Sequence, residues 1–199
     1  MNGYPEIRLR RLRATEGLRR MLAAPLPGPE KFIWPVFVTG GRKQRAPIAA
    51  MPGQFRFSVD ELLRALEPVA AAGVGGVLLF GAPPADAKDA HGRGAWSAQG
   101  AVQRAVRAIR RTFPGLVLMT DVCLCAYTDH GHCGALDAAG AVDNDATLDL
   151  LAKVALSHAD AGRFAAGPRP TMNPTDGCWQ HGALPGLRHR VGRRCAHFP

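Results

Sequence analysis

The fold is decided by Val102-Gln-Arg-Ala-Val-Arg-Ala-Ile-Arg-Arg-Thr-Phe-Pro-Gly-Leu-Val-Leu-Met-Thr120. Apolar side chains recur in this stretch at helical spacing, at Val102, Val106 and Ile109, and arginines fill positions between them. Pro114-Gly115 then breaks the helix. The run 116–120 has the length and the apolar content of a buried strand. The stretch therefore predicts a helix that leads directly into a strand.

The same alternation continues on the N-terminal side. Residues 32–38 and 76–80 are two further apolar runs of strand length. Between them, Ser58-Val-Asp-Glu61 matches a capping box, with serine at the N-cap and glutamate at the third helical position. Gly73 is placed to close the helix that follows. This half of the chain therefore predicts a strand, a helix and a second strand.

On the C-terminal side a third helix is capped by Asn144 or Asp145 and ends at Gly162. Strands that alternate with amphipathic helices predict an α/β fold with repeated β/α units around a parallel sheet. The strand runs lack polar alternation, which favours strands covered on both faces. The order of elements leaves open whether the sheet is doubly wound or part of a (β/α)8 barrel. No Gly-x-Gly-x-x-Gly follows a strand, so a dinucleotide site is not expected.

The chain is strongly basic, with a formal net charge of +9 and a pI near 10.1. Such a charge raises nucleic acid as a partner. The arginines, however, are concentrated at the two ends of the chain, and no aromatic side chains are interleaved with them to stack bases. We therefore expect a solvated basic arm and no nucleic-acid partner.

The distribution of apolar residues predicts a cytoplasmic protein. No run of about 18 or more apolar residues occurs, so no transmembrane helix and no membrane partner are expected. Residues 1–11 lack the apolar core of a secretory signal. Because cytosolic chains rarely form disulfides, clustered cysteines indicate metal ligands or catalytic thiols first.

Cys123-x-Cys125, with Cys133 eight residues later, is the most informative feature of the chain. Thiolates are soft ligands that zinc binds in a tetrahedral arrangement. Gly131 and Gly134 flank Cys133 and allow the loop to swing the third sulfur back toward the other two. Three protein ligands leave a fourth position open, which is typical of catalytic zinc. The group also follows a strand directly, where parallel β/α folds place their chemistry.

Other interpretations of this loop stay open on spacing alone. The cysteines could be buried structural residues, or His130 or His132 could complete a closed structural knuckle as the fourth ligand. Asp121, at the end of the strand, could orient a substrate amine or cap the loop.

The segment Asp121-Val-Cys-Leu-Cys-Ala-Tyr-Thr-Asp-His-Gly-His-Cys-Gly134 resembles the metal-loop signature of zinc-dependent porphobilinogen synthases, also called delta-aminolevulinic acid dehydratases. Further stretches agree with this family in order and spacing, so that the resemblance covers about residues 6–162. These stretches are 8–13, 34–38, 51–53, 77–81, 88–89, 144–147 and 157–162.

The resemblance implies a TIM (β/α)8 barrel, of which this chain holds only the first three or so β/α units. We expect an N-terminal basic arm at 1–30 and a partial barrel domain with the zinc loop at 31–162. After Gly162 the sequence is dominated by Gly, Pro, Arg and His and shows no strand or helix pattern. We therefore expect residues 163–199 to be a disordered or non-native tail, produced by truncation or a frameshift.

The resemblance also implies an activity, a cofactor and partners. Members of the family are hydro-lyases that condense two 5-aminolevulinate molecules to porphobilinogen in heme and other tetrapyrrole biosynthesis, usually as homo-octamers. It implies Cys123, Cys125 and Cys133 as ligands of Zn²⁺ and Asp121 as an active-site carboxylate. Some members replace these cysteines and depend on Mg²⁺, but no such site is expected in this chain.

The chain departs from the family at its lysines. Family members form Schiff bases with the substrates through two lysines in later strands. The lysines of this chain lie outside those motifs, at Lys31, Lys43, Lys88 and Lys153. We therefore expect the chain by itself to be inactive, because Schiff-base chemistry needs a positioned amine. The alternative is a non-catalytic zinc-binding fragment that docks on a partner.

Overall fold

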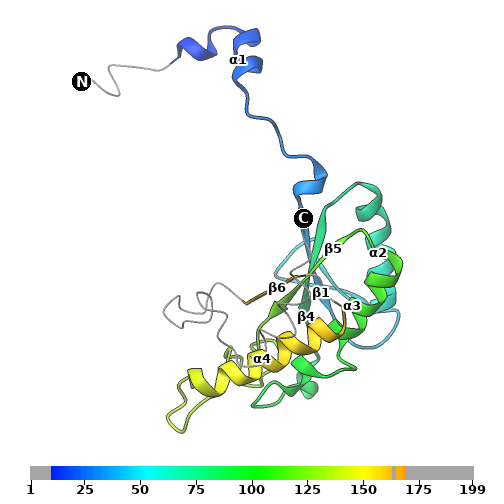
Figure 1. The fold of residues 1–199 in the computed structure, drawn as a ribbon, viewed down its shortest axis with the longest axis vertical. Helices are drawn as coiled ribbons and strands as arrows, with labels where there is room; N and C mark the ends of the chain where they lie inside the picture. The colour runs from blue at the N-terminus through cyan, green and yellow to red at the C-terminus, as the bar shows by residue number, and fades with distance from the viewer. Residues whose placement is uncertain (1–9, 163–164, 169–199) are drawn as a thin grey trace, which may run out of the picture.

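A computed structural model describes residues 10–162 and 165–168. Six strands form one sheet in this part of the chain, together with α-helices and short 3-10 helices (Figure 1). The strands are β1 (Ile33–Val38), β2 (Arg45–Pro47), β3 (Phe55–Phe57), β4 (Gly76–Gly81), β5 (Val117–Val122) and β6 (Ala165–Pro168). The α-helices are α1 (Glu16–Leu22), α2 (Val59–Ala71), α3 (Ala101–Thr112) and α4 (Asn144–Asp160). The 3-10 helices are η1 (Arg11–Arg13), η2 (Pro29–Lys31), η3 (Ala85–Ala87) and η4 (Arg93–Trp96).

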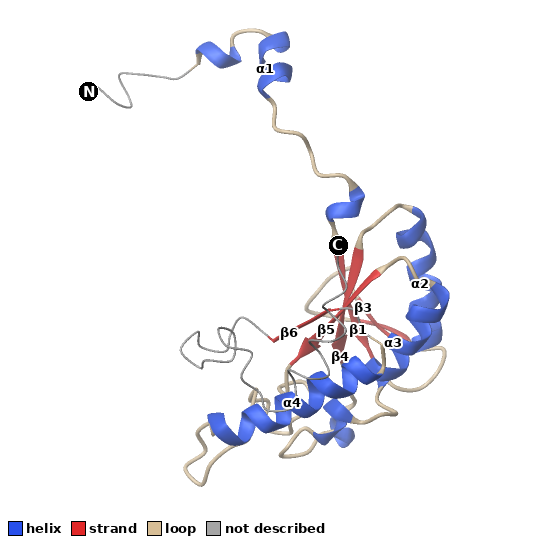
Figure 2. Ribbon diagram, in the orientation of Figure 1, coloured by secondary structure: helices blue, strands red, loops and turns tan. Residues whose placement is uncertain are grey.

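The sheet has the strand order β2-β3-β1-β4-β5-β6, and its pairs are parallel except β2 with β3. From β1 to β6 the strands follow one another in chain order without reversal. Since β/α crossovers are right-handed, this order puts every connecting helix on one face, and Figure 2 shows α2, α3 and α4 on the same side of the sheet. A doubly wound sheet would reverse direction at a switch point. The arrangement is therefore a sector of a (β/α)8 barrel, as the resemblance implied.

The strands predicted from the apolar runs are confirmed as β1, β4 and β5. Their burial, however, alternates along the chain. The side chains that face the helices are fully buried, as at Val38, Leu79 and Leu118. Residues adjacent to these in the strands, such as Phe37 and Phe80, are only half-buried. The expectation that the strands are covered on both faces is thus wrong for the described residues, because all three connecting helices lie on one side and the other face is the concave side of an incomplete barrel.

The apolar layer between sheet and helices holds this sector together. It contains Leu62 and Leu66 of α2 and Val106 and Ile109 of α3, all without solvent exposure. Each such side chain stabilises the fold by roughly 1.5–3 kcal/mol relative to leaving it in water. The helical spacing of these residues in the sequence is what directs them into one layer.

The start of α2 differs from the predicted capping box. Ser58 is the N-cap, but its side chain makes no bond to the helix amides. The Ser58 hydroxyl accepts from the Gln44 amide at 2.9 Å and donates to the Asp60 carboxylate at 2.7 Å. The capping-box prediction is therefore wrong, because the loop before β2 crosses the helix end and supplies the partner. Gly73 closes the helix as predicted, with a positive φ of 80°.

The N-cap of α4 is one residue earlier than expected. Asp143 accepts from the Ala146 amide at 3.0 Å, so neither Asn144 nor Asp145 is the N-cap. Asp143 has extended backbone angles, which let its carboxylate reach the amide three residues on. Gly162 follows the helix with a φ of 95°, in agreement with the predicted end.

The prediction that no strand occurs after Gly162 is wrong for Ala165–Pro168. These residues form β6 and pair in parallel with β5, in the register Asp121↔Gly167. A strand of this kind depends on backbone hydrogen bonds to an edge that is already formed, so no apolar run announces it in the sequence. The rest of the expected tail, 163–164 and 169–199, lies outside the described residues.

The N-terminal segment lies apart from the sheet. Figure 1 shows α1 at the end of an extended connection that leads away from β1. Its apolar side chains are exposed, at Leu12, Met21, Leu22 and Leu26. Within the described residues, no helix combines the length and the apolar content that a membrane crossing requires.

Candidate metal centre

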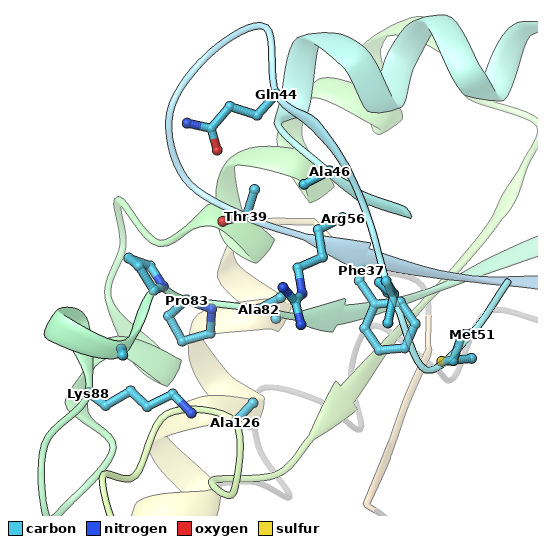
Figure 3. A pocket seen from close by; sticks show the side chains of 14 residues that line it. Phe37, Thr39, Gln44, Ala46, Met51, Arg56, Ala82, Pro83, Lys88 and Ala126 are labelled. Atoms are coloured by element: carbon cyan, nitrogen blue, oxygen red, sulfur yellow. The ribbon is translucent and has the colours of Figure 1, made fainter. Parts of the chain in front are cut away.

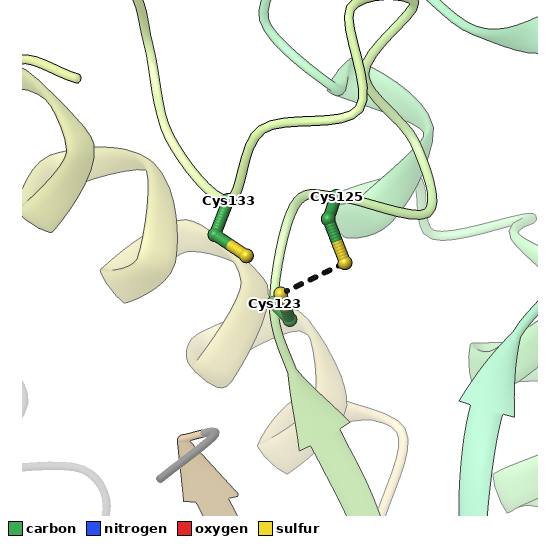
Figure 4. A group of neighbouring side chains, drawn as sticks. All are labelled: Cys123, Cys125 and Cys133. Atoms are coloured by element: carbon green, nitrogen blue, oxygen red, sulfur yellow. Dashed lines mark hydrogen bonds between the residues drawn. The ribbon is translucent and has the colours of Figure 1, made fainter. Parts of the chain in front are cut away.

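The three clustered cysteines come together directly beyond the end of β5. Cys123 follows the last residue of that strand and is only 6% exposed. Its sulfur lies 3.4 Å from the sulfur of Cys125. The sulfur of Cys133 joins them, so that all three lie within 4.8 Å of one another (Figure 4). The structure thus brings together the three residues that the sequence singled out.

Two glycines let the loop return Cys133 to the strand end. Gly131 has a φ of +77°, a left-handed conformation that most other residues adopt only with strain. Gly134 is needed for space, since a Cβ atom there would lie 2.2 Å from the Thr147 hydroxyl oxygen of α4. The Thr128 hydroxyl also ties the loop by donating to the His132 carbonyl at 2.8 Å. The two glycines and the Thr128 hydrogen bond therefore place the third sulfur.

The sulfur group has the size that a zinc ion requires. Tetrahedral zinc with Zn–S bonds of about 2.3 Å separates its sulfur ligands by roughly 3.8 Å. The sulfurs of Cys123 and Cys125 are 3.4 Å apart, slightly less than this value, and all three sulfurs lie within 4.8 Å of one another. Small side-chain rotations would adjust them. The donor set also fits zinc better than magnesium, because magnesium prefers oxygen ligands.

The surroundings of Cys123 keep its thiol protonated when no cation is bound. The hydrogen bond with the Cys125 thiol, followed by burial, raises the pKa of Cys123 well above its usual range. Both effects disfavour a thiolate that stands without a counter-charge. A divalent cation replaces the protons and supplies that charge, so metal binding at such a group is coupled to proton release.

The two histidines of the loop do not belong to the sulfur group among the described residues. His130 Nδ1 accepts from the His132 amide at 3.1 Å, and His130 Nε2 lies 3.1 Å from the Ala90 carbonyl. This pattern corresponds to the tautomer that carries its proton on Nε2. His130 therefore links the cysteine loop to the loop after β4. Among residues 10–162, the sulfur group has three protein donors.

Asp121 lies on β5, two residues before Cys123, and is half-buried. The alternation along the strand puts it on the face that the helices do not cover. Burial, and after it the charge of Asp121, raises the pKa of Tyr127 above its usual range. The carboxylate and the phenol are therefore close enough to interact.

Tyr127 is a residue of the site that the sequence did not single out. Its hydroxyl reaches the end of β4, where a Cβ atom at Gly81 would lie 1.8 Å from the phenol oxygen. A Cβ atom at Gly92 or Gly94 would lie 3.3 Å from an atom of the Tyr127 side chain. The Tyr127 side chain thus packs closely against three glycines. Their spacing gave no signal, because they belong to segments that meet only in the folded chain.

Comparison with known proteins agrees with this geometry. The family model described as delta-aminolevulinic acid dehydratase matches residues 6–176. The chain belongs to the delta-aminolevulinic acid dehydratase family. The match continues beyond Gly162, where we expected the resemblance to end, and includes the strand β6.

Relatives in the delta-aminolevulinic acid dehydratase family share about two fifths of their residues with this chain. The enzyme of that name from Streptomyces coelicolor is 43% identical over 191 residues, which are 96% of this chain and 56% of the relative. The one from Ruminiclostridium josui is 40% identical over 166 residues, 83% of this chain and 80% of the relative.

A solved structure shows the same fold. The delta-aminolevulinic acid dehydratase of Toxoplasma gondii ME49, in complex with the reaction product porphobilinogen, superimposes with a TM-score of 0.81 at 29% identity. The match covers 95% of this chain and 52% of that chain. The chain thus spans about half the length of most of these relatives, and the sheet is the corresponding part of a porphobilinogen synthase barrel.

Proposed function

We propose that this chain is the metal-binding part of a delta-aminolevulinic acid dehydratase and that Cys123, Cys125 and Cys133 hold Zn²⁺. The reaction of the whole enzyme would be the condensation of two 5-aminolevulinate molecules to porphobilinogen in tetrapyrrole biosynthesis. The observation that carries the proposal is the convergence of three sulfurs within 4.8 Å at the end of β5. Family membership and the soft character of the donors support zinc as the metal.

The chain's own residues would orient and activate one substrate. Bound zinc would supply a Lewis acid with an open coordination position. Asp121 would accept hydrogen bonds from the substrate amine, since it lies on the helix-free face of β5, two residues before Cys123. Tyr127 would hold the loop against β4 with its phenol protonated, because burial and the Asp121 charge raise its pKa.

The structure gives a physical reason to expect no turnover from this chain alone. Lys31 lies in η2, beside the N-terminal segment, and Lys153 lies on α4, 5.8 Å from the centre of the Trp96 ring. Lys43 lies in the turn before β2, where its amide donates to Asp60. These three lysines lie on elements other than the cysteine loop. Lys88 lies at the mouth of the barrel, but it is outside the Schiff-base motifs of the family.

Zinc content tests the proposal directly. We expect the purified full chain, loaded with Zn²⁺ and freed of excess metal, to retain about one ion per chain by atomic emission spectroscopy. Cys123→Ser and Cys133→Ser should lose the ion, because two thiolates cannot complete the site. Cys178→Ser is the matched control, since it removes a thiol outside the described residues and should keep the metal.

Cobalt substitution adds a spectroscopic measurement of the same ligands. Co²⁺ bound by the cysteine group should show sulfur-to-metal charge-transfer absorption, which Cys125→Ser should weaken. Equal loss of metal from Cys178→Ser and Cys133→Ser would mean that the ion binds without a defined site, and the proposal would be wrong.

A second candidate function is a non-catalytic zinc-binding fragment that docks on a partner. It is favoured by the helix-free face of the sheet, where Phe37 and Phe80 stack at a centroid distance of 5.4 Å yet stay only half-buried. This face is the concave side of the barrel sector, so another polypeptide could cover it. Porphobilinogen formation separates the two candidates, since only the first includes catalysis once the barrel is complete.

The remaining expectations from the sequence stay proposals. They comprise a cytoplasmic location, assembly as a homo-octamer, and the division into an arm at 1–30, a partial barrel at 31–162 and a tail at 163–199. Exposed leucines in the N-terminal segment give the arm an apolar surface that an assembly could bury.

A further inference from the structure

The concave face of the sheet carries rows of apolar side chains that the chain itself leaves uncovered. Alternation along the strands directs Pro35, Leu78 and Met119 to this face, and the register places the three side by side on β1, β4 and β5. Phe37 and Phe80 form the next row toward the carboxyl ends of the strands. All five side chains are exposed or half-buried in the described part of the chain. In a complete barrel, side chains at such positions fill the interior.

At the carboxyl ends of β1 and β4 this face opens into a cavity of about 560 Å³. Figure 3 shows that Arg56 and Lys88 extend into the cavity and that Phe37 forms part of its wall. The two cations therefore lie at the mouth of the barrel, whereas the row of Pro35, Leu78 and Met119 lies further from it. An apolar surface of this kind marks a site of contact with another polypeptide.

The parallel strands of the sheet amount to half of a barrel. β1, β4, β5 and β6 run parallel in consecutive order, and a closed barrel of this type has eight strands. Residues 169–199 are too few for four more strands with their helices, since the four strands and their connections take residues 33–168. A second copy of the chain supplies the missing four strands. Its rotation by half a turn about the barrel axis keeps all eight strands parallel.

The two outer edges of these four strands complement each other. Among the described residues, β3 pairs with β1 only at Phe37 and Val38, which leaves the edge at residues 33–36 open. β6 (Ala165–Pro168) is the last strand on the opposite side, and its four residues match the open stretch in length. Ile33 on the open edge is 47% exposed. An open, apolar strand edge is a template for pairing with another chain.

Closure of the barrel also fixes the register of the new strand pair. The existing pairs connect Pro35, through Leu78 and Met119, to Ala165 at one level of the sheet. An eight-stranded barrel of this type has a shear of about 8, so the register falls by about four residues across each half. Ala165 then lies beside the partner's Lys31 and Gly167 beside the partner's Ile33. This register keeps β6 clear of the part of β1 that β3 occupies.

We propose that two copies of this chain close one (β/α)8 barrel, in which β6 of each copy pairs with β1 of the other. The apolar rows of the two concave faces fill the shared interior. The cysteine loops of both copies lie at the same mouth, because the rotation keeps all strands parallel. The inference rests on the second candidate function, docking on a partner, and names that partner as a second copy.

Sedimentation velocity of the zinc-loaded full chain tests the proposal. We expect a dimer with twice the 21.2 kDa mass of one chain. Ile33→Lys places a charge on the open edge of β1 and should raise the dissociation constant of the dimer at least about tenfold. Leu26→Lys is the matched control, because Leu26 is an apolar side chain outside the sheet that is 92% exposed, and its replacement should leave the dimer intact. Circular dichroism verifies that both variants fold.

Disulfide trapping tests the strand pairing itself. The zinc-loaded chains carry Cys178→Ser and Cys195→Ser, so that no thiol outside the described residues takes part. Ile33→Cys chains are mixed with Gly167→Cys chains and oxidised. The mixed pair should form a covalent dimer, because neighbouring residues on paired strands have the spacing that a disulfide requires. Arg64→Cys mixed with Gly167→Cys is the control and should form none, since Arg64 lies exposed on α2.

Three outcomes would overturn the proposal. A monomer at every concentration would leave the concave face to a different polypeptide. An assembly that Leu26→Lys abolishes and Ile33→Lys retains would place the interface on the N-terminal segment. Trapping of two Ile33→Cys chains in place of the mixed pair would contradict the two-fold barrel, which keeps these two residues on opposite sides of its axis.

Zinc content measured on the same samples keeps this proposal distinct from the metal centre. A monomer that holds one zinc ion per chain would contradict the shared barrel and support the cysteine site. A dimer that depends on Ile33 but holds no zinc would support the shared barrel and contradict the cysteine site.

Discussion

At the scale of single residues, Gly81 is the point against which the cysteine loop packs. A Cβ atom at this position would lie 1.8 Å from the phenol oxygen of Tyr127, a side chain that is partly buried. Gly81→Ala should therefore displace the ring and destabilise the protein by about 1–3 kcal/mol, the usual cost of overpacking a closed site. Urea unfolding monitored by circular dichroism measures this loss.

Gly115→Ala is the matched control for this prediction. Gly115 lies in the turn before β5, and a Cβ atom there would meet nothing within 4 Å. Its replacement should change stability by no more than about 0.5 kcal/mol. If Gly81→Ala were as stable as Gly115→Ala, the close packing of Tyr127 on β4 would be refuted.

The sequence identified some residues of the site and missed others for a physical reason. Cys123, Cys125 and Cys133 were visible because thiols clustered at short spacing indicate metal ligands. Gly131 was visible because it flanks Cys133. Tyr127 and Gly81 were not, because their contact joins two β/α units that are separated in the chain. No local pattern records such a contact.

At the scale of elements, Asp60 links the N-terminus of α2 to the loop before β2. Its carboxylate accepts from the Ser58 hydroxyl at 2.7 Å and from the Lys43 amide at 2.8 Å. These bonds, the one from Ser58 first, lower the pKa of Asp60 from 3.8. Lys43 is also held at a φ of 53°, a conformation that non-glycine residues rarely adopt.

The direction of this shift predicts the pH dependence of stability. Because the folded pKa of Asp60 is depressed, its contribution is present above the unfolded value of 3.8 and is lost as the pH falls through the folded pKa. Asp60→Asn should therefore be less stable than the parent chain at neutral pH, and the difference should shrink in acid. Urea midpoints at neutral and acidic pH measure it.

Asp149→Asn provides the comparison for Asp60→Asn. Asp149 is an exposed carboxylate on α4, away from the loop before β2. Its replacement should shift the urea midpoint little at either pH. A constant difference between Asp60→Asn and the parent chain across the acidic range would contradict the assigned role of the carboxylate.

The elements with strong internal patterns were predictable. β1, β4 and β5 follow from apolar runs, and α2, α3 and α4 follow from helical spacing. The short strands β2, β3 and β6 were not predicted, because each is defined by pairing with a strand that is already in place. The capping-box prediction failed for a similar reason, because the partner of the Ser58 hydroxyl is Gln44, in a loop fourteen residues earlier.

At the scale of the whole molecule, the purified chain should form no porphobilinogen. The reason is that none of its lysines lies in the Schiff-base motifs of the family, while the proposed metal centre and Asp121 would at most orient a substrate. A colorimetric assay of porphobilinogen with zinc and 5-aminolevulinate measures this. The Streptomyces coelicolor relative, assayed in parallel, is the positive control. Turnover that survives removal of contaminating host enzyme would sink the prediction.

The sequence by itself determined the alternation of strands and helices, the family and the three thiols that form the candidate centre. These features are local, because periodicity, breakers and short cysteine spacings lie within single segments.

Only the tertiary structure decided the order of the strands and the alternating burial along them. It also decided the packing of Tyr127 against three glycines and the cavity that Arg56 and Lys88 face. Each of these depends on contacts between segments far apart in the chain. The same apolar strand run fits an open sheet or a barrel, and the packing of all connecting helices on one face makes the choice.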